Sequence, residues 1–213
     1  MSGLTVACVL RSGGDFDPQW VRALQVGVSE YLPPPHRFVC LSDVPVPCER
    51  VSLEHSWPGW WAKMEAFGLP AEYGRVLYLD LDTLPVGDMS GLAAIRAPLA
   101  LIRDLNPRIP HLQTGVMAFS AGPSSYAAML YAAFRERAGD NLKGYHSHAR
   151  WVEAYADAPD VIQDLAPGDV VSYKLDCRDA RPEGPALVCG HGQPRFSDPA
   201  AGWAHELWRK RAA

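Results

Sequence analysis

Residues 75–83 read Arg-Val-Leu-Tyr-Leu-Asp-Leu-Asp-Thr, the most informative stretch of the sequence. Its apolar part predicts a buried strand over Arg75–Leu79, because a short apolar run bounded by polar residues is typical of a core strand. Asp80 and Asp82 follow at the carboxyl end of that strand. In open α/β sheets, ligands bind outside the carboxyl ends of the strands. If the chain stays extended after Leu79, both carboxylates reach into such a crevice.

Two acids at the end of a buried strand are typical of a cation site. Burying carboxylates close together is costly unless a positive charge compensates them. Mn²⁺ and Mg²⁺ accept oxygen ligands and commonly bridge to substrate phosphates. We therefore expect Mn²⁺ or Mg²⁺ at Asp80 and Asp82. The alternative is a strand end with two solvated acids.

The segments around this strand alternate between strand and helix patterns. The apolar run Leu4–Leu10 predicts a buried strand, and a Gly-rich turn follows it. Pro18 opens a helix that extends to about Tyr31. The alternation favours a mostly parallel sheet with crossover helices. Further strands are expected at Phe38–Leu41, Arg50–Leu53, Pro98–Ile102, Gly115–Ser120, Val170–Tyr173 and Ala186–Cys189, and further helices at Pro123–Arg137, Ala149–Tyr155 and Trp203–Arg211.

A helix is also predicted over Gly59–Leu69, just before the acidic strand. Helical spacing places Trp60, Met64 and Phe67 on one side of it. This pattern favours Trp60 as a core residue, although an aromatic face also suits stacking on a sugar or a base.

Composition excludes several classes of protein. The chain of 213 residues is 48% hydrophobic, which suits a single domain over residues 1–213. Its 7 Trp, 8 Tyr and 6 Phe exclude a disordered coil, and a net charge of -4 excludes a global basic surface for nucleic acid. No apolar run approaches the ~20 residues of a membrane span, and no signal peptide is evident. Five scattered cysteines then favour a cytoplasmic protein with reduced thiols.

Four segments together resemble a known enzyme fold. They are Ala-Cys-Val-Leu-Arg-Ser-Gly-Gly at 7–14, the Lys-bearing helix at 60–67, the acidic motif at 78–83, and Gly-His-Gly-Gln-Pro-Arg-Phe at 190–196. In this order they resemble the GT-A-fold glycosyltransferases, especially the glycogenin-like and bacterial family 8 enzymes. The resemblance spans most of the chain. It implies an α/β fold with a Rossmann-like, mostly parallel mixed sheet flanked by helices.

The resemblance also implies an activity and its site residues. Such enzymes move a sugar from a nucleotide-diphosphate donor, here a UDP-sugar, to an acceptor hydroxyl of a saccharide, lipid or protein, and family 8 enzymes retain the anomeric configuration. The implied metal ligands are Asp80, Asp82 and His191. A metal there would neutralise charge on the departing diphosphate. The implied nucleotide and diphosphate contacts are Leu10, Arg11, Ser12, Gly13, Lys63, Leu81, Gly192 and Arg195.

Two departures from the family pattern concern the donor sugar. Gln113-Thr114 stands where the family has Asn followed by Ser or Thr, and His148-Ala149 replaces an Asp-Gln pair. Gln113, Thr114 and His148 are therefore the donor-site candidates, and no catalytic base is assigned. The missing Asp-Gln pair leaves open a nucleotide-sugar-binding protein without turnover.

A second alternative is a haloacid-dehalogenase-like phosphatase with Asp80 as its nucleophile. That class usually has Thr or Val two residues after the second Asp, whereas this chain has Leu84. Its motif usually lies on the first strand, and here the motif comes after several α/β segments.

Overall fold

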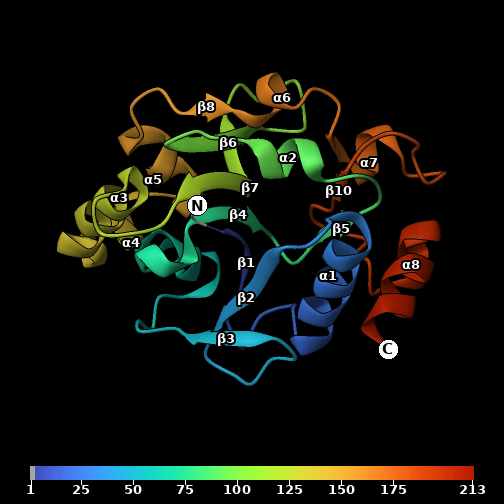
Figure 1. The fold of residues 1–213 in the computed structure, drawn as a ribbon, viewed down its shortest axis with the longest axis horizontal. Coiled ribbons are helices and arrows are strands. Elements are labelled where there is room, and N and C mark those ends of the chain that lie inside the picture. Colours follow the sequence, from blue (N-terminus) through green and yellow to red (C-terminus); the bar gives the residue numbers. More distant parts are fainter. Residues whose placement is uncertain (1–2) are drawn as a thin grey trace.

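A seven-stranded mixed sheet forms the centre of the molecule in the computed structural model, which describes residues 3–213 (Figure 1). Its strands are β1 (Leu4–Leu10), β2 (His36–Ser42), β3 (Glu49–Ser52), β4 (Arg75–Leu79), β6 (Leu99–Arg103), β7 (Leu112–Ser120) and β8 (Asp160–Val161). They lie in the order β3-β2-β1-β4-β7-β6-β8. The predicted strand at the acidic motif, β4, therefore occupies the middle of the sheet.

Most strand pairs in this sheet are parallel. β1 pairs in parallel with β2 and β4, β2 with β3, and β6 with β8. β7 is antiparallel to both β4 and β6, because β6 and β7 are consecutive strands joined by a loop. The predicted α/β class with a mostly parallel mixed sheet is confirmed.

A second, three-stranded sheet lies beyond the acidic motif. It consists of β5 (Thr83–Pro85), β10 (Leu187–Cys189) and β9 (Val170–Ser172), in the order β5-β10-β9. β5 begins directly after the two acids and runs antiparallel to β10, with Thr83 opposite Cys189. The pairing places the chain that follows β10 beside the acidic motif.

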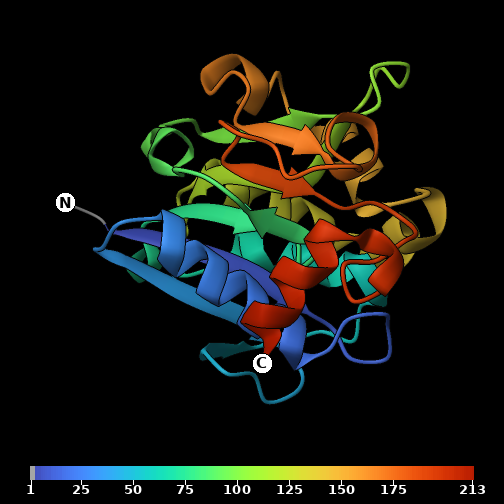
Figure 2. The same cartoon turned by 90° about the vertical axis from the view of Figure 1, so that its right-hand side faces the viewer.

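Helices cover both faces of the large sheet. They are α1 (Pro18–Tyr31), η1 (Gly59–Gly68), η2 (Ala71–Tyr73), α2 (Ser90–Ala94), α3 (Tyr126–Glu136), α4 (Ala138–Gly144), α5 (His148–Tyr155), α6 (Ile162–Leu165), α7 (Tyr173–Asp176), η3 (Pro199–Ala201) and α8 (Trp203–Ala212). α1 and α8 pack against each other on one side, in front of the sheet in Figure 2, and α3 and α5 lie on the other side. Among residues 3–213, no helix has the length and apolar character that crossing a membrane requires.

The strand β1 shows how the sequence builds two cores. Its side chains alternate between faces, as in any strand. Val6, Cys8 and Leu10 enter the core beneath α1, whereas Ala7 enters the core on the opposite face with Trp61.

The five cysteines are all free thiols.

The helix predicted over Gly59–Leu69 is a 3₁₀ helix, η1. A 3₁₀ helix has about 3.0 residues per turn, so residues i and i+3 lie one above the other. Trp61, Met64 and Phe67 consequently share the buried face. Trp60 is 56% exposed, so its predicted place in the core beside Met64 and Phe67 is wrong.

Other boundaries differ for local reasons. α3 begins at Tyr126 rather than Pro123, because the Ser125 hydroxyl caps it by accepting from the amide of Ala128 at 3.1 Å. β7 begins three residues before the predicted Gly115, where it continues its pairing with β6. The elements β5, β8, α2, α4, α6 and α7 were not predicted, since each is too short for a clear hydrophobic period.

Candidate functional site

A cavity of about 770 Å³ opens where β1 and β4 end. Its wall comes from the loop after β1, the start of η1, the acidic motif, the β6–β7 segment, the start of α5 and the segment after β10. The structure places every predicted site residue on this wall: Leu10, Arg11, Ser12, Gly13, Lys63, Asp80, Leu81, Asp82, Gln113, Thr114, His148, His191, Gly192 and Arg195. Segments far apart in the sequence therefore meet at one place.

The acidic motif turns instead of staying extended. The amide of Asp80 donates to the carbonyl of Gly115 at 2.8 Å, which continues the pairing of β4 with β7. The amide of Thr83 then donates back to the carbonyl of Asp80 at 3.0 Å and closes a turn. The expected extended geometry is wrong at this point, because Thr83 has to enter the second sheet. Both Asp80 and Asp82 nevertheless line the cavity.

Each acid is held by a cationic side chain. Lys63 Nζ lies 2.5 Å from Asp80 Oδ2, and the hydroxyl of Tyr78 donates to Asp80 Oδ1 at 2.9 Å. Arg195 Nη1 lies 3.0 Å from Asp82 Oδ2. Two ion pairs thus lie on the cavity wall, with side chains only 16–23% exposed. This arrangement presents both signs of charge to a ligand such as a diphosphate with its cation.

These surroundings change the pKa of Asp82. Burial, followed by the negative charge of Asp80, raises the pKa of Asp82 to about 7, although Lys63 and Arg195 oppose the rise. A further positive charge beside Asp82 would favour its ionised form.

Arg195 connects the acidic motif to the loop after β1. Its Nη2 lies 2.9 Å from Asp15 Oδ2, and its guanidinium stands 5.0 Å from the ring of Phe16. Asp17, not Asp15, caps α1 by accepting from the amide of Gln19 at 2.9 Å. Asp15 is thereby left free to pair with Arg195.

His191 reaches the cavity because β10 pairs with β5. The amide of Gly190 donates to the carbonyl of Asp82 at 2.7 Å, so the chain passes directly beside the acidic turn. The ring Nε2 of His191 lies 2.7 Å from the hydroxyl of Ser172. Burial and the positive charge of Lys174 lower the pKa of His191, which favours the neutral ring that metals bind.

The donor set fits Mn²⁺ or Mg²⁺ in its chemistry, since two carboxylates and one imidazole face one cavity. Within residues 3–213, however, no three His, Cys, Asp or Glu side chains are already grouped as a metal site. For the three predicted ligands to share one ion, each has to exchange its present partner for the metal.

The loop after β1 is ordered by an acid that the sequence analysis missed. Asp43 accepts from the Ser12 amide at 2.9 Å and from the Ser12 hydroxyl at 2.7 Å, and Arg11 Nε lies 3.6 Å away. Burial of Asp43 acts to raise its pKa, but the bonds from Ser12 and the charge of Arg11 outweigh it and lower the pKa. Asp43 follows directly after β2, as Asp80 follows β4, and this shared pattern was the available signal.

The donor-site candidates form two polar pairs. Gln113 Nε2 donates to Asp104 Oδ2 at 2.7 Å, and the Thr114 hydroxyl is hydrogen-bonded to His148 Nε2. Burial, with the charges of Lys63 and Arg150, lowers the pKa of His148 well below its ordinary value, so its ring is neutral. Among the described residues, His148 Nδ1 has no hydrogen-bond partner.

Solved structures share this fold at low sequence identity. A glycosyltransferase, GlyE of Streptococcus pneumoniae TIGR4, matches with a TM-score of 0.72 and 14% identity over 98% of this chain and 60% of that one. The galactosyltransferase LgtC, solved with donor and acceptor sugar analogs, matches with a TM-score of 0.59 and 14% identity over 98% of this chain and 95% of that one. The bifunctional glycosyltransferase WbbM matches with a TM-score of 0.62 and 11% identity over 100% of this chain and 50% of that one.

These likenesses confirm the expected GT-A-like fold. The chain spans 60% of the length of GlyE and half of WbbM. No protein-family model matches the sequence, and no curated protein is similar enough in sequence to match it.

Proposed function

We propose that this chain is a metal-dependent glycosyltransferase that moves a sugar from a UDP-sugar to an acceptor hydroxyl with retention of configuration. The observation that carries the proposal is that two ion pairs, Lys63 with Asp80 and Arg195 with Asp82, line one cavity at the carboxyl end of β4. The GT-A-like fold supports it, because the GlyE, LgtC and WbbM structures are glycosyltransferases.

The charged residues have complementary roles in this proposal. Asp80, Asp82 and His191 hold Mn²⁺ or Mg²⁺, which when bound acts as a Lewis acid on the departing diphosphate. Lys63 and Arg195 then turn from the acids to the diphosphate oxygens. Arg195 suits this task because its planar guanidinium can contact phosphate through two parallel N–H bonds.

The remaining wall residues bind the other parts of the donor. The loop Leu10–Gly13, ordered by Asp43, holds the base and ribose. Leu81 and Gly192 border the diphosphate, and the positive φ of +65° at Gly192 suits a turn whose backbone comes close to phosphate oxygens. Gln113, Thr114 and the neutral ring of His148 face the donor sugar.

No carboxylate is assigned as catalytic base. The bond between the anomeric carbon and the diphosphate oxygen breaks, and the acceptor oxygen bonds to that carbon. The acceptor hydroxyl gives its proton to an oxygen of the departing diphosphate, which gains negative charge as its bond to the sugar breaks. Lys63 and Arg195 stabilise that charge in the same step.

Thermal shift with UDP-sugars, with and without Mn²⁺, tests the binding part of the proposal, and release of UDP in the presence of acceptors tests transfer. We expect a UDP- and Mn²⁺-dependent rise in melting temperature that Asp82→Ala abolishes. Asp140→Ala is the matched control, because this acid lies on α4 in an exposed ion pair with Arg137. An undiminished shift in Asp82→Ala would refute the site.

The alternatives predict other outcomes. Tight UDP binding without release of UDP from any donor would indicate a binding protein, consistent with His148 in place of the family's Asp-Gln pair. Phosphate release from p-nitrophenyl phosphate that depends on Asp80 would indicate a phosphatase. The GT-A-like strand order and the position of the motif on β4 do not favour a phosphatase.

A further inference from the structure

Trp60 is exposed at the cavity. It is 56% exposed, whereas its neighbour Trp61 is only 6% exposed. Trp60 and Ile109 are the two strongly exposed large hydrophobic side chains that line the cavity, in the part of the chain that the structure describes. An indole that lies outside the core and borders a cavity is typical of a binding surface, since aromatic rings contribute much of the contact energy in ligand pockets.

The geometry of η1 connects Trp60 to the reacting end of the cavity. Residues i and i+3 of a 3₁₀ helix lie in one row, about 6 Å apart along the axis. Trp60 and Lys63 form such a row, and Lys63 is bound to Asp80 at 2.5 Å. A ligand group that reaches Lys63 and Asp80 therefore has room to extend along this row to the indole.

Polar residues of the β6–β7 loop line the same cavity. Asp104 is fixed there, because its Oδ1 accepts from the amide of Asn106 at 2.8 Å and its Oδ2 accepts from Gln113 at 2.7 Å. Asn106 lies on the wall as well. One flat apolar surface combined with fixed polar groups suits a pyranose, which presents an apolar C–H face and a rim of hydroxyls. Leu105 and Ile109 of the same loop also line the cavity, but Asp104 and Asn106 interrupt them, whereas an acyl chain would need a continuous apolar wall.

We infer that Trp60 is the stacking platform for a saccharide acceptor, with the sugar ring against the indole and its hydroxyls toward Asp104 and Asn106. The inference rests on the proposed function and narrows its acceptor from a saccharide, lipid or protein to a saccharide. The nucleotide base has its own place at Leu10–Gly13 in that proposal.

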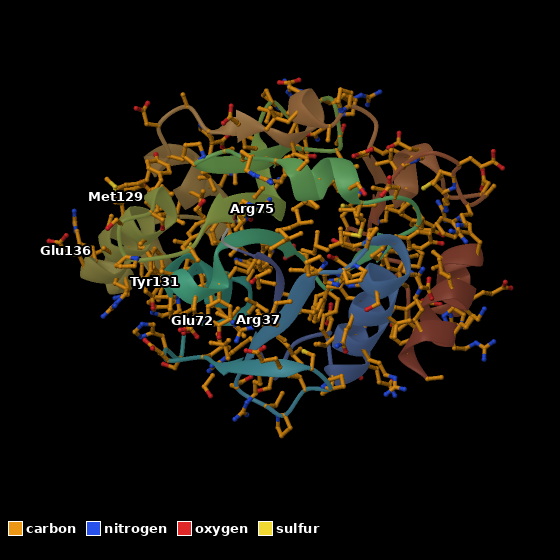
Figure 3. The ribbon with its side chains drawn as sticks, viewed as in Figure 1. Arg37, Glu72, Arg75, Met129, Tyr131 and Glu136 are labelled. Atoms are coloured by element: carbon orange, nitrogen blue, oxygen red, sulfur yellow. The ribbon has the colours of Figure 1, made fainter. Side chains whose placement is uncertain are left out.

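Saturation-transfer difference NMR on the full chain tests this inference, with methyl β-D-galactoside, methyl β-D-glucoside, methyl β-lactoside and 1-octanol as ligands, each with and without UDP and Mn²⁺. We expect transfer to the ring C–H protons of at least one glycoside. Trp60→Ala should weaken that binding about tenfold, and Trp60→Phe should restore part of it. Met129→Ala is the matched control, because Met129 is 63% exposed, lies on α3 (Figure 3) and is not one of the residues that line the cavity.

Four results would overturn the inference. They are glycoside signals unchanged in Trp60→Ala, no glycoside signal in the unmodified chain, binding of 1-octanol in place of the glycosides, and loss of UDP binding in Trp60→Ala, which would make the indole a base platform. Failure of the proposed function is separable. If UDP and Mn²⁺ do not bind but the Trp60-dependent glycoside signal persists, a saccharide site stands and the nucleotide-sugar donor is refuted.

Discussion

Replacing Asp82 with Asn should stabilise the metal-free protein, with a gain that depends on pH. Burial and the neighbouring Asp80 raise the pKa of Asp82 from 3.8 to about 7. An acid whose pKa is higher in the folded than in the unfolded chain destabilises the fold as it ionises. The protonated Asp82 makes its full contribution to the free energy of unfolding below pH 3.8, and this contribution is lost as the pH rises through about 7. Asn cannot ionise, so Asp82→Asn escapes this loss.

The size of the effect follows from the two pKa values. Integrating the linkage relation gives a gain for Asp82→Asn that is about 2–3 kcal/mol larger at pH 8 than at pH 5. A cost of about 1–2 kcal/mol that does not depend on pH opposes it, because an asparagine at this position would accept the hydrogen bond from Arg195 less well than the carboxyl group of Asp82 does. Arg195 keeps its second partner, Asp15, at 2.9 Å. For a chain of this size, the pH-dependent part corresponds to about 5–10 °C in melting temperature.

The assay is thermal or urea unfolding of both proteins from pH 5 to pH 8.5 in EDTA, followed by the same series with Mn²⁺. Asp140→Asn is the control, since Asp140 pairs with Arg137 in solvent. We expect Mn²⁺ to raise the melting temperature of the unmodified chain and to leave Asp82→Asn unchanged.

Two results would contradict this reasoning. A difference in unfolding free energy that stays constant from pH 5 to pH 8.5 would show that Asp82 ionises as an ordinary carboxyl. An equal Mn²⁺ effect on both proteins would show that Asp82 does not bind the metal.

Three further predictions concern the surroundings of the site. Gly115→Ala places a methyl group 3.5 Å from Asp80 Oδ2, which is an ordinary contact, so the free energy of unfolding should change by no more than about 0.5 kcal/mol. The rise in melting temperature with UDP and Mn²⁺ should become smaller, and an undiminished rise would argue against Asp80 as a ligand. Glu65→Ala leaves the backbone amides of Glu54 and His55 without their acceptor and should lower the free energy of unfolding in urea by about 2–4 kcal/mol. A loss below about 1 kcal/mol would contradict this prediction. Because the pKa of His148 is lowered, the unmodified chain should lose up to about 2 kcal/mol between pH 6.5 and pH 5, and His148→Gln should avoid this loss; parallel pH profiles would refute it.

The local features of the fold were predictable from the sequence. β1, α1 and β4 have the predicted bounds, since a continuous apolar run specifies each strand and a clear helical period specifies the helix. The two acids after β4 predicted the side of the sheet on which the cavity opens. Short elements such as β5 gave no such signal, and the 3₁₀ form of η1 was missed because its apolar residues also fit an α-helical spacing.

Contacts between distant segments decided the rest. The sequence alone predicted a buried strand ending in two acids and a late His-bearing segment, because local runs of side chains specify these features. Only the tertiary structure decided that β10 pairs with β5 and brings the 190–195 segment to the acidic turn, and that Arg195 joins Asp82 to Asp15. Such pairings depend on how the strands pack against one another. Nothing in the neighbouring residues of either partner encodes them.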